Sequence, residues 1–116
     1  MKYVMLICWQ GAWHGTTPEA QKEGYDEIWA YLAKWEKAGK VVDGGAELDL
    51  PGTAKTVRRT DNGVTVVDGP YMELKEFLAG FLILEADDID EAVAVASEWP
   101  GIKYGESVEV RPVIPH

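Results

Sequence analysis

The sequence predicts one α+β domain, in which an antiparallel sheet carries its helices on one face. The first observation is the order of the predicted elements: strand, helix, strand, hairpin, strand, helix, strand, or two strand-helix-strand halves with an insertion between them. The second is length, because 116 residues with 47% hydrophobic content suffice for one compact core and not for two. We therefore expect a single domain over residues 1–116, with a ferredoxin-like, split βαβ fold and a β-hairpin insertion.

The N-terminal half begins with a strand over Lys2–Trp9 that is apolar on both of its alternating faces. A helix follows after a short loop and starts at Thr16 or Thr17, where a hydroxyl cap and Pro18 favour the first turn. Gly39 ends this helix in the left-handed cap position. Apolar side chains at spacings of three and four predict the buried stripe of the helix: Tyr25, Ile28, Trp29, Leu32 and Trp35.

The middle of the chain is predicted to hold a short strand and a hairpin. The short strand covers Lys40–Asp43 and is closed by the pair Gly44-Gly45. The hairpin joins Lys55–Thr60 to Val64–Val67 around Asp61-Asn62-Gly63, a strong signal for a tight turn between strands.

The C-terminal half repeats the strand-helix-strand order. Phe77–Ala86 is a second strand that is apolar on both faces, and Gly80 within it indicates a close approach of another backbone segment. The second helix starts at an Asp88 cap, which Glu91 can complete to a capping box. Glu106–Val113 is the last strand. The predicted inner stripe of the second helix comprises Ile89, Ala92, Val93, Ala96 and Trp99.

The two strands that are apolar on both faces have a consequence for assembly. The helices of a ferredoxin-like domain cover only one face of its sheet. The second face needs another cover, and a second copy of the chain is the simplest candidate. We therefore predict a homodimer in which the subunits pack sheet to sheet.

Composition limits the classes of partner. Eleven Lys and Arg against twenty Asp and Glu give a net charge of −9, so the surface should repel phosphate backbones and anionic membranes. The longest apolar stretch, Phe77–Leu84, is far shorter than the roughly 20 residues of a membrane-spanning helix, and no signal segment is recognised. Cys8 alone excludes an internal disulfide and fits a reducing compartment. We expect a cytoplasmic protein with no nucleic-acid partner, membrane partner, metal or cofactor, because no phosphate loop or ligand cluster is found.

The stretch of residues 66–76 combines a tight turn with a group of charges. Asp68-Gly69-Pro70 accounts for the turn, through an aspartate that bonds backbone amides, a flexible glycine and a proline with fixed φ. The turn does not require Glu73 or Lys75. Paired carboxylates such as Asp68 and Glu73 can take separate pKa values near apolar groups, which leaves one to act as acid or base. Alternatively, Asp68 only bonds the turn backbone while Glu73 and Lys75 are solvated.

This stretch also carries a family resemblance. Residues 67–76, read as Val-Asp-Gly-Pro-Tyr-x-Glu-x-Lys-Glu, resemble the signature of the YCII-related family in its DGPF-motif branch, with Tyr71 where that branch usually has Phe. Gly80-Phe81, the first strand and the closing segment 107–113 are similar as well. The resemblance implies a dimeric α+β barrel with ligand pockets inside or beside the barrel.

The resemblance also bears on the candidate residues. It implies that Asp68, Glu73 and Lys75 belong together in one functional motif. YCII-type relatives were proposed to use a histidine within the first helix, but that position falls near Ile28 in this chain. Chemistry based on that histidine is therefore not expected here.

Other candidates lie outside the motif. His14 follows Trp13 in a glycine-flanked loop, where its imidazole can transfer protons near neutral pH or can simply be solvated. Trp9 and Trp13 bracket the end of the first strand and are candidates to line a pocket. Arg111 shares a strand face with Glu109, and the two present charges to a pocket or form an exposed salt bridge.

Two hypotheses follow from the sequence. In the first, a dimeric α+β barrel binds a small organic molecule and supports cofactor-free acid-base chemistry on it. Its catalytic residues are then Asp68, Glu73 and His14, and its ligand-binding residues are Trp13, Tyr71, Lys75 and Arg111. In the second, which the DGPF resemblance implies, the chain is a non-catalytic regulatory or protein-interaction module associated with transcription regulation. The sequence leaves open whether the protein is an enzyme.

Overall fold

The computed structural model describes residues 1–9, 17–70 and 76–116 of the chain. In these ranges no helix is long and apolar enough to cross a membrane. Two short 3₁₀ helices, η2 (Pro51–Thr53) and η3 (Pro100–Tyr104), accompany the regular elements. The strands and α-helices are β1 (Lys2–Trp9), α1 (Pro18–Lys37), β2 (Val41–Glu47), β3 (Lys55–Thr60), β4 (Gly63–Asp68), β5 (Phe77–Glu85), α2 (Ile89–Ser97) and β6 (Ser107–Pro112).

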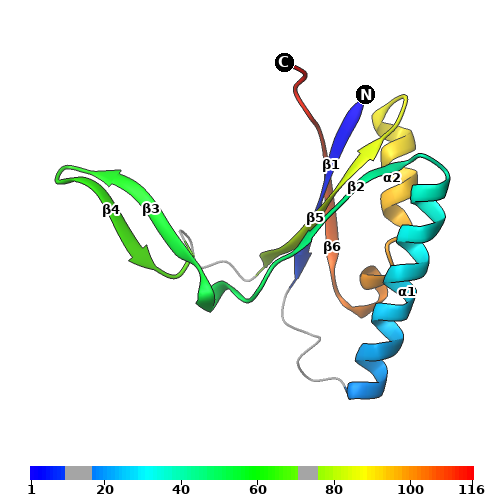
Figure 1. Cartoon of the computed structure of the whole chain (residues 1–116), viewed down its shortest axis with the longest axis horizontal. Coiled ribbons are helices and arrows are strands. Elements are labelled where there is room, and N and C mark those ends of the chain that lie inside the picture. Colours follow the sequence, from blue (N-terminus) through cyan, green and yellow to red (C-terminus); the bar gives the residue numbers. More distant parts are fainter. Residues whose placement is uncertain (10–16, 71–75) are drawn as a thin grey trace.

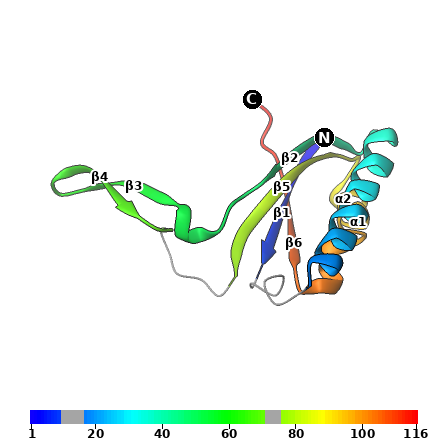
Figure 2. The same ribbon diagram turned by 60° about the horizontal axis from the view of Figure 1, so that its bottom comes forward.

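The central feature is a four-stranded antiparallel sheet in the order β2-β5-β1-β6. Both α-helices lie on the same side of this sheet (Figure 2). The hairpin β3–β4 forms a separate two-stranded sheet that projects away from the body (Figure 1). This arrangement confirms the predicted ferredoxin-like fold with a hairpin insertion.

The core lies between the helices and the sheet face that they cover. From the sheet, Met5 and Leu84 are fully buried. The hydroxyl of Tyr31 on α1 donates a hydrogen bond of 2.8 Å to the carbonyl of Val95 on α2, which ties the two helices together. The remaining buried residues of the cluster are Tyr3, Ile7, Val41, Leu82, Ala86, Ala92, Ala96 and Trp99.

Within the described ranges, no helix lies over the opposite sheet face (Figure 2). Val4 and Leu6 of β1 point to this outer face, and β5 places Ile83 and Phe81 beside them. These four side chains are half-buried in the single chain. The prediction that β1 and β5 are apolar on both faces, with helices covering only one, is confirmed.

Local signals set most element boundaries as predicted. The side chain of Thr17 accepts a hydrogen bond of 3.2 Å from the amide of Ala20 and caps α1, and Gly39 follows the end of that helix with φ +74°. The side chain of Asp88 caps α2 by accepting a hydrogen bond of 2.8 Å from the amide of Glu91. Short polar side chains at these positions satisfy amides that have no partner inside the helix.

The predicted helix stripes are wrong in part. On α1, Tyr25 and Trp29 are exposed, whereas Tyr31 is buried. On α2, Val93 is exposed and Val95 is buried. The physical reason is that a helix buries the side chains that its neighbours happen to cover, and periodicity alone does not locate the centre of that stripe.

The second strand is longer than predicted, because β2 continues through both glycines to Glu47. Gly45 takes φ +60°, and its amide donates a hydrogen bond of 2.7 Å to the carboxylate of Asp43. This bends the strand without ending it. Gly80 is the predicted point of close approach: a Cβ there would lie 2.6 Å from the carbonyl oxygen of Ala46. Glycines on both strands therefore let β2 stay next to β5.

Candidate functional site

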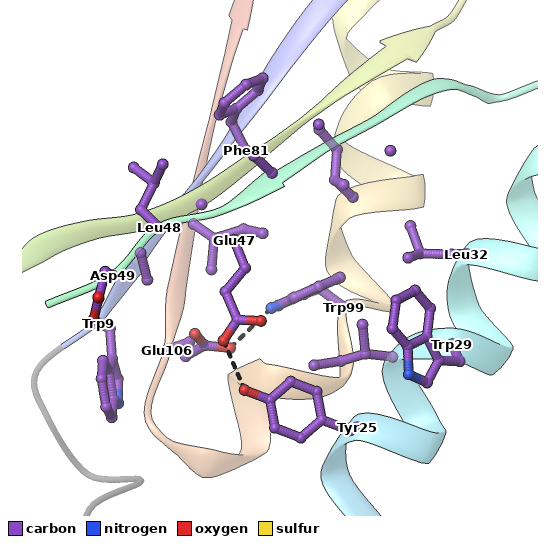
Figure 3. A pocket seen from close by; sticks show the side chains of 18 of the residues that line it. Trp9, Tyr25, Trp29, Leu32, Glu47, Leu48, Asp49, Phe81, Trp99 and Glu106 are labelled. Atoms are coloured by element: carbon purple, nitrogen blue, oxygen red, sulfur yellow. Dashed lines mark hydrogen bonds between the residues drawn. The ribbon is translucent and has the colours of Figure 1, made fainter.

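A cavity of about 800 Å³ opens between α1 and the ends of β2 and β5 (Figure 3). The segment from Trp99 to Glu106, which includes η3, closes it at one end. A cavity of this size fits a small organic molecule. The side chains that matter most to its chemistry are Trp9, Tyr25, Trp29, Glu47, Trp99 and Glu106.

Aromatic rings form much of the wall. Trp9, at the end of β1, is buried and makes an edge-to-face contact with Phe77, with ring centroids 5.4 Å apart. Trp99 is also buried, whereas the Trp29 side chain is 65% exposed. An exposed indole beside a cavity offers a flat apolar surface on which a ring-shaped ligand can stack.

Tyr25 and Glu47 join the helix wall to the sheet wall. The Tyr25 hydroxyl donates a hydrogen bond of 2.6 Å to Oε1 of Glu47 (Figure 3). This bond is the main reason that the pKa of Tyr25 rises to about 12, and burial adds to the effect. Tyr25 therefore keeps its proton at neutral pH and holds the Glu47 carboxylate in position.

Glu106 is the second carboxyl group of the cavity. Its Oε1 accepts a hydrogen bond of 3.0 Å from Nε1 of Trp99 (Figure 3). Burial raises the pKa of Glu106 above its ordinary value, the charge of Glu47 raises it further, and the Trp99 bond works in the opposite direction. Two neighbouring carboxyl groups in unequal surroundings are suited to separate acid and base roles.

The backbone around η3 explains how Glu106 reaches the cavity. Gly105 follows η3 with φ +100°, a left-handed conformation that reverses the chain. The amide of Glu106 then donates a hydrogen bond of 3.1 Å to the carbonyl of Gly101. Gly101 has no side chain, and a Cβ there would collide with the Glu106 carboxylate. The turn thus places the carboxylate against Trp99.

The charged side chains among the described cavity residues are all acidic. They are Glu36, Glu47, Asp49 and Glu106, and the described part of the lining includes no Lys, Arg or His. Across the described ranges no group of His, Cys, Asp and Glu is arranged to hold a metal ion. The potential inside the cavity should therefore favour neutral or positively charged ligands.

The comparisons with known proteins identify the family. The YCII-related domain model matches residues 1–116. The chain belongs to the YCII-related domain family. A family relative, an uncharacterized protein of Rhizobium meliloti (strain 1021), is 35% identical over 89 residues, which cover 75% of this chain and 70% of that protein. The predicted family resemblance is confirmed, and the DGPF branch stays a prediction.

A solved structure is also similar to this family member. It is 5-chloro-2-hydroxyhydroquinone dehydrochlorinase (TftG) from Burkholderia phenoliruptrix, in complex with 2,5-dihydroxybenzoquinone. The TM-score is 0.58 at 20% sequence identity, and the match covers 98% of this chain and 94% of that chain. At this identity the similarity shows the shared fold.

Two of the site residues predicted from the sequence, Asp68 of the motif and Arg111 of the last strand, lie apart from the cavity. Asp68 ends β4 on the projecting hairpin, is highly exposed and forms an ion pair with Lys55. Arg111 lies on the outer face of the sheet, and its Nε donates a hydrogen bond of 2.7 Å to the carboxylate of Glu109. Neither residue lines the cavity. Their predicted roles in catalysis and ligand binding stay predictions.

The other sequence-predicted site residues fall outside the described ranges. These are Trp13, His14, Tyr71, Glu73 and Lys75. Of the two tryptophans proposed for a pocket, Trp9 lines the cavity, as predicted.

Sequence reasoning missed Tyr25, Glu47 and Glu106 as site residues. The helical spacing predicts that Tyr25 is buried in the core, Glu47 lies beyond the predicted second strand, and Glu106 is predicted to start the last strand. No local motif joins them, since their bonds connect residues on different elements. The one usable signal was Glu106 between Gly105 and the last strand, a charged residue directly after a glycine turn.

The raised pKa of Glu106 predicts a pH effect on stability. Above the ordinary value near 4.5, the unfolded chain loses the Glu106 proton while the folded chain still holds it. The contribution of Glu106 to the free energy of unfolding therefore falls as the pH rises through the window from 4.5 to the raised value. Urea denaturation of wild type and Glu106→Gln should show the wild type losing stability relative to the variant across this window. A difference that stays constant with pH would contradict the assignment.

Proposed function

We propose that the cavity binds a small, neutral, hydroxylated ring compound and that Glu106 and Glu47 transfer protons to and from it. The observation that carries this proposal is the pair of carboxyl groups in unequal surroundings inside one aromatic-walled cavity. Glu106, whose pKa is raised, is suited to give a proton. Glu47, whose carboxylate accepts the Tyr25 hydrogen bond, is suited to take one.

The proposed step is proton exchange at a ring carbon activated by hydroxyl groups. Glu106 delivers its proton to the carbon, and Glu47 removes the proton that the carbon carried before. The carbon then carries two C–H bonds. When the original C–H bond breaks, its electron pair returns to the ring and restores aromaticity, so no oxidant, reductant or cofactor enters the balance. Trp29 supplies the flat surface on which the ring lies.

The comparisons support a ring compound as the ligand class. TftG, which shares the fold, is named for the dehydrochlorination of a chlorinated hydroxyhydroquinone and was solved with a dihydroxybenzoquinone. The alternative of a regulatory module gains no support from the family match or from this structure. We also keep the homodimer and the cytoplasmic location as proposals, the first because the outer sheet face is apolar.

The acidic lining predicts selection against anionic rings. Resorcinol and 3,5-dihydroxybenzoate share the same dihydroxylated ring and differ by one carboxylate. A like charge within several ångströms of Glu47 or Glu106 costs roughly 1–4 kcal/mol, so resorcinol should bind at least about fivefold more tightly. Titration of the protein with each compound, followed by NMR, measures the two Kd values.

Two variants show whether the cavity acids cause this selectivity. In Glu47→Gln the ratio of the two Kd values should fall, because one negative charge has gone. The matched control is Glu109→Gln, which removes a carboxylate on the outer face of the sheet and should leave the ratio unchanged. Equal affinity for both compounds would refute the charge argument, and no binding of either would refute the ring class.

A further inference from the structure

The hairpin β3–β4, which we call the arm, forms a separate two-stranded sheet that extends from the body (Figures 1 and 2). Its register places Val57 opposite Val66, and Val64 opposite Arg59, on the same face. All three valines are exposed: Val57 by 63%, Val64 by 75% and Val66 by 58%. The arm therefore presents a small apolar surface, the valine face, to solvent.

A two-stranded hairpin of this kind is marginally stable in water by itself. Two hydrogen bonds of 2.7 Å lie at its base. The amide of Gly69 donates one to the carbonyl of Ala54, and the Thr56 hydroxyl donates the other to the carbonyl of Gly69. Lys55 and Asp68 pair across the strands at the same end. These bonds hold the two strands together at the base but bury none of the valines. Stability of the whole arm calls for a surface that covers the valine face.

Charge indicates what that surface is. The arm carries three basic residues, Lys55, Arg58 and Arg59, against two acidic ones, Asp61 and Asp68, while the whole chain has a net charge of −9. The body from which the arm projects is therefore strongly acidic. A basic arm on an acidic body is complementary to the body of another copy of the same chain.

The outer face of the sheet offers the matching apolar area. Val4, Leu6, Phe81 and Ile83 are half-buried there, and neither α1 nor α2 lies over them. The arm of the same chain points away from this face (Figures 1 and 2). In a two-fold dimer each arm can instead reach the other subunit, and both contacts form together.

We propose that the arm packs its valine face on the body of a second copy of the chain, so that two subunits clasp each other. This inference goes beyond the proposed function, because it concerns neither the cavity nor its carboxyl groups. It assigns a role to the Asp68-Gly69 turn, which holds the base of the arm. The three valines are too small to form a stable interface of about 800 Å² per partner, so each arm covers part of the partner's outer sheet face and is one part of a larger contact between the subunits.

Sedimentation equilibrium of the full chain tests the proposal with two neighbouring substitutions. Val66→Lys places a charge in the valine face, whereas Val67→Lys places the same charge on the opposite face of the same strand. The dimer Kd should rise at least about tenfold in Val66→Lys, the loss expected for one buried valine, and should change less than about threefold in Val67→Lys. Circular dichroism confirms that both variants keep the fold.

A second measurement does not depend on a substitution. Amide hydrogen exchange of β3 and β4 in the wild type should slow as the protein concentration rises through the dimer Kd, because docking protects the arm. A wild-type chain that stays monomeric at high micromolar concentration would overturn the proposal. So would equal dimer Kd values for Val66→Lys and wild type, or arm exchange that is independent of concentration.

Discussion

Glutamine in place of Glu106 is expected to slow proton exchange at the ring carbons of resorcinol by about 10² to 10⁴, the usual contribution of a general acid or base. Glutamine keeps the shape of the side chain and can still accept the hydrogen bond from Trp99, but it has no proton to deliver. Incorporation of deuterium into the resorcinol ring in heavy water, followed by NMR, measures the rate. The binding of resorcinol should change much less than the rate.

The control for this experiment is again Glu109→Gln, whose carboxylate lies on the outer sheet face. Asp68→Asn belongs in the same series, because Asp68 is a catalytic residue in the hypothesis drawn from the sequence. A large loss of rate in Asp68→Asn, with the fold intact, would move the catalytic role to the arm. An unchanged rate in Glu106→Gln would refute the role of the cavity pair.

Alanine in place of Gly45 is expected to destabilise the protein by about 3 kcal/mol or more, since a strained backbone costs roughly 1–2 kcal/mol and overpacking roughly 1–3. Gly45 has φ +60°, and a Cβ there would collide with the carbonyl group of Phe81 in the next strand. The collision involves backbone on both strands, so no side chain can move to relieve it. Urea denaturation measures the change in the free energy of unfolding.

The adjacent glycine supplies the matched control. A Cβ on Gly44 would lie 3.6 Å from Oε1 of Glu36, an ordinary contact. Gly44→Ala should therefore change the free energy of unfolding by less than about 1 kcal/mol. Similar stabilities for the two variants would show that β2 moves away from β5 at little cost. Because β2 carries Glu47, Gly45→Ala should also weaken the binding of resorcinol.

The fold could be predicted in large part, because its signals are local. The turn at Asp61-Asn62-Gly63, the cap at Thr17 and the cap at Asp88 act through bonds within a few residues. The family motif added the expected assembly of these elements. The extent of β2 could not be predicted, because glycines usually end a strand. Here β2 continues through both, since glycine at position 45 allows the close approach to β5.

The candidate site depended on contacts that no local pattern encodes. Tyr25 and Glu47 are 22 positions apart in the chain, and they meet because α1 and β2 pack at one end of the sheet. Glu106 reaches the same cavity through a glycine turn, and its pKa depends on how deeply the surrounding body buries it.

The order of the elements, the charge of the chain and the turn at the base of the arm follow from the residues alone, because propensity, composition and capping act at short range. Which carboxyl groups share a cavity, and which apolar faces remain uncovered, depends on how the elements pack. Burial and long-range electrostatics exist only after segments distant in the sequence have come together.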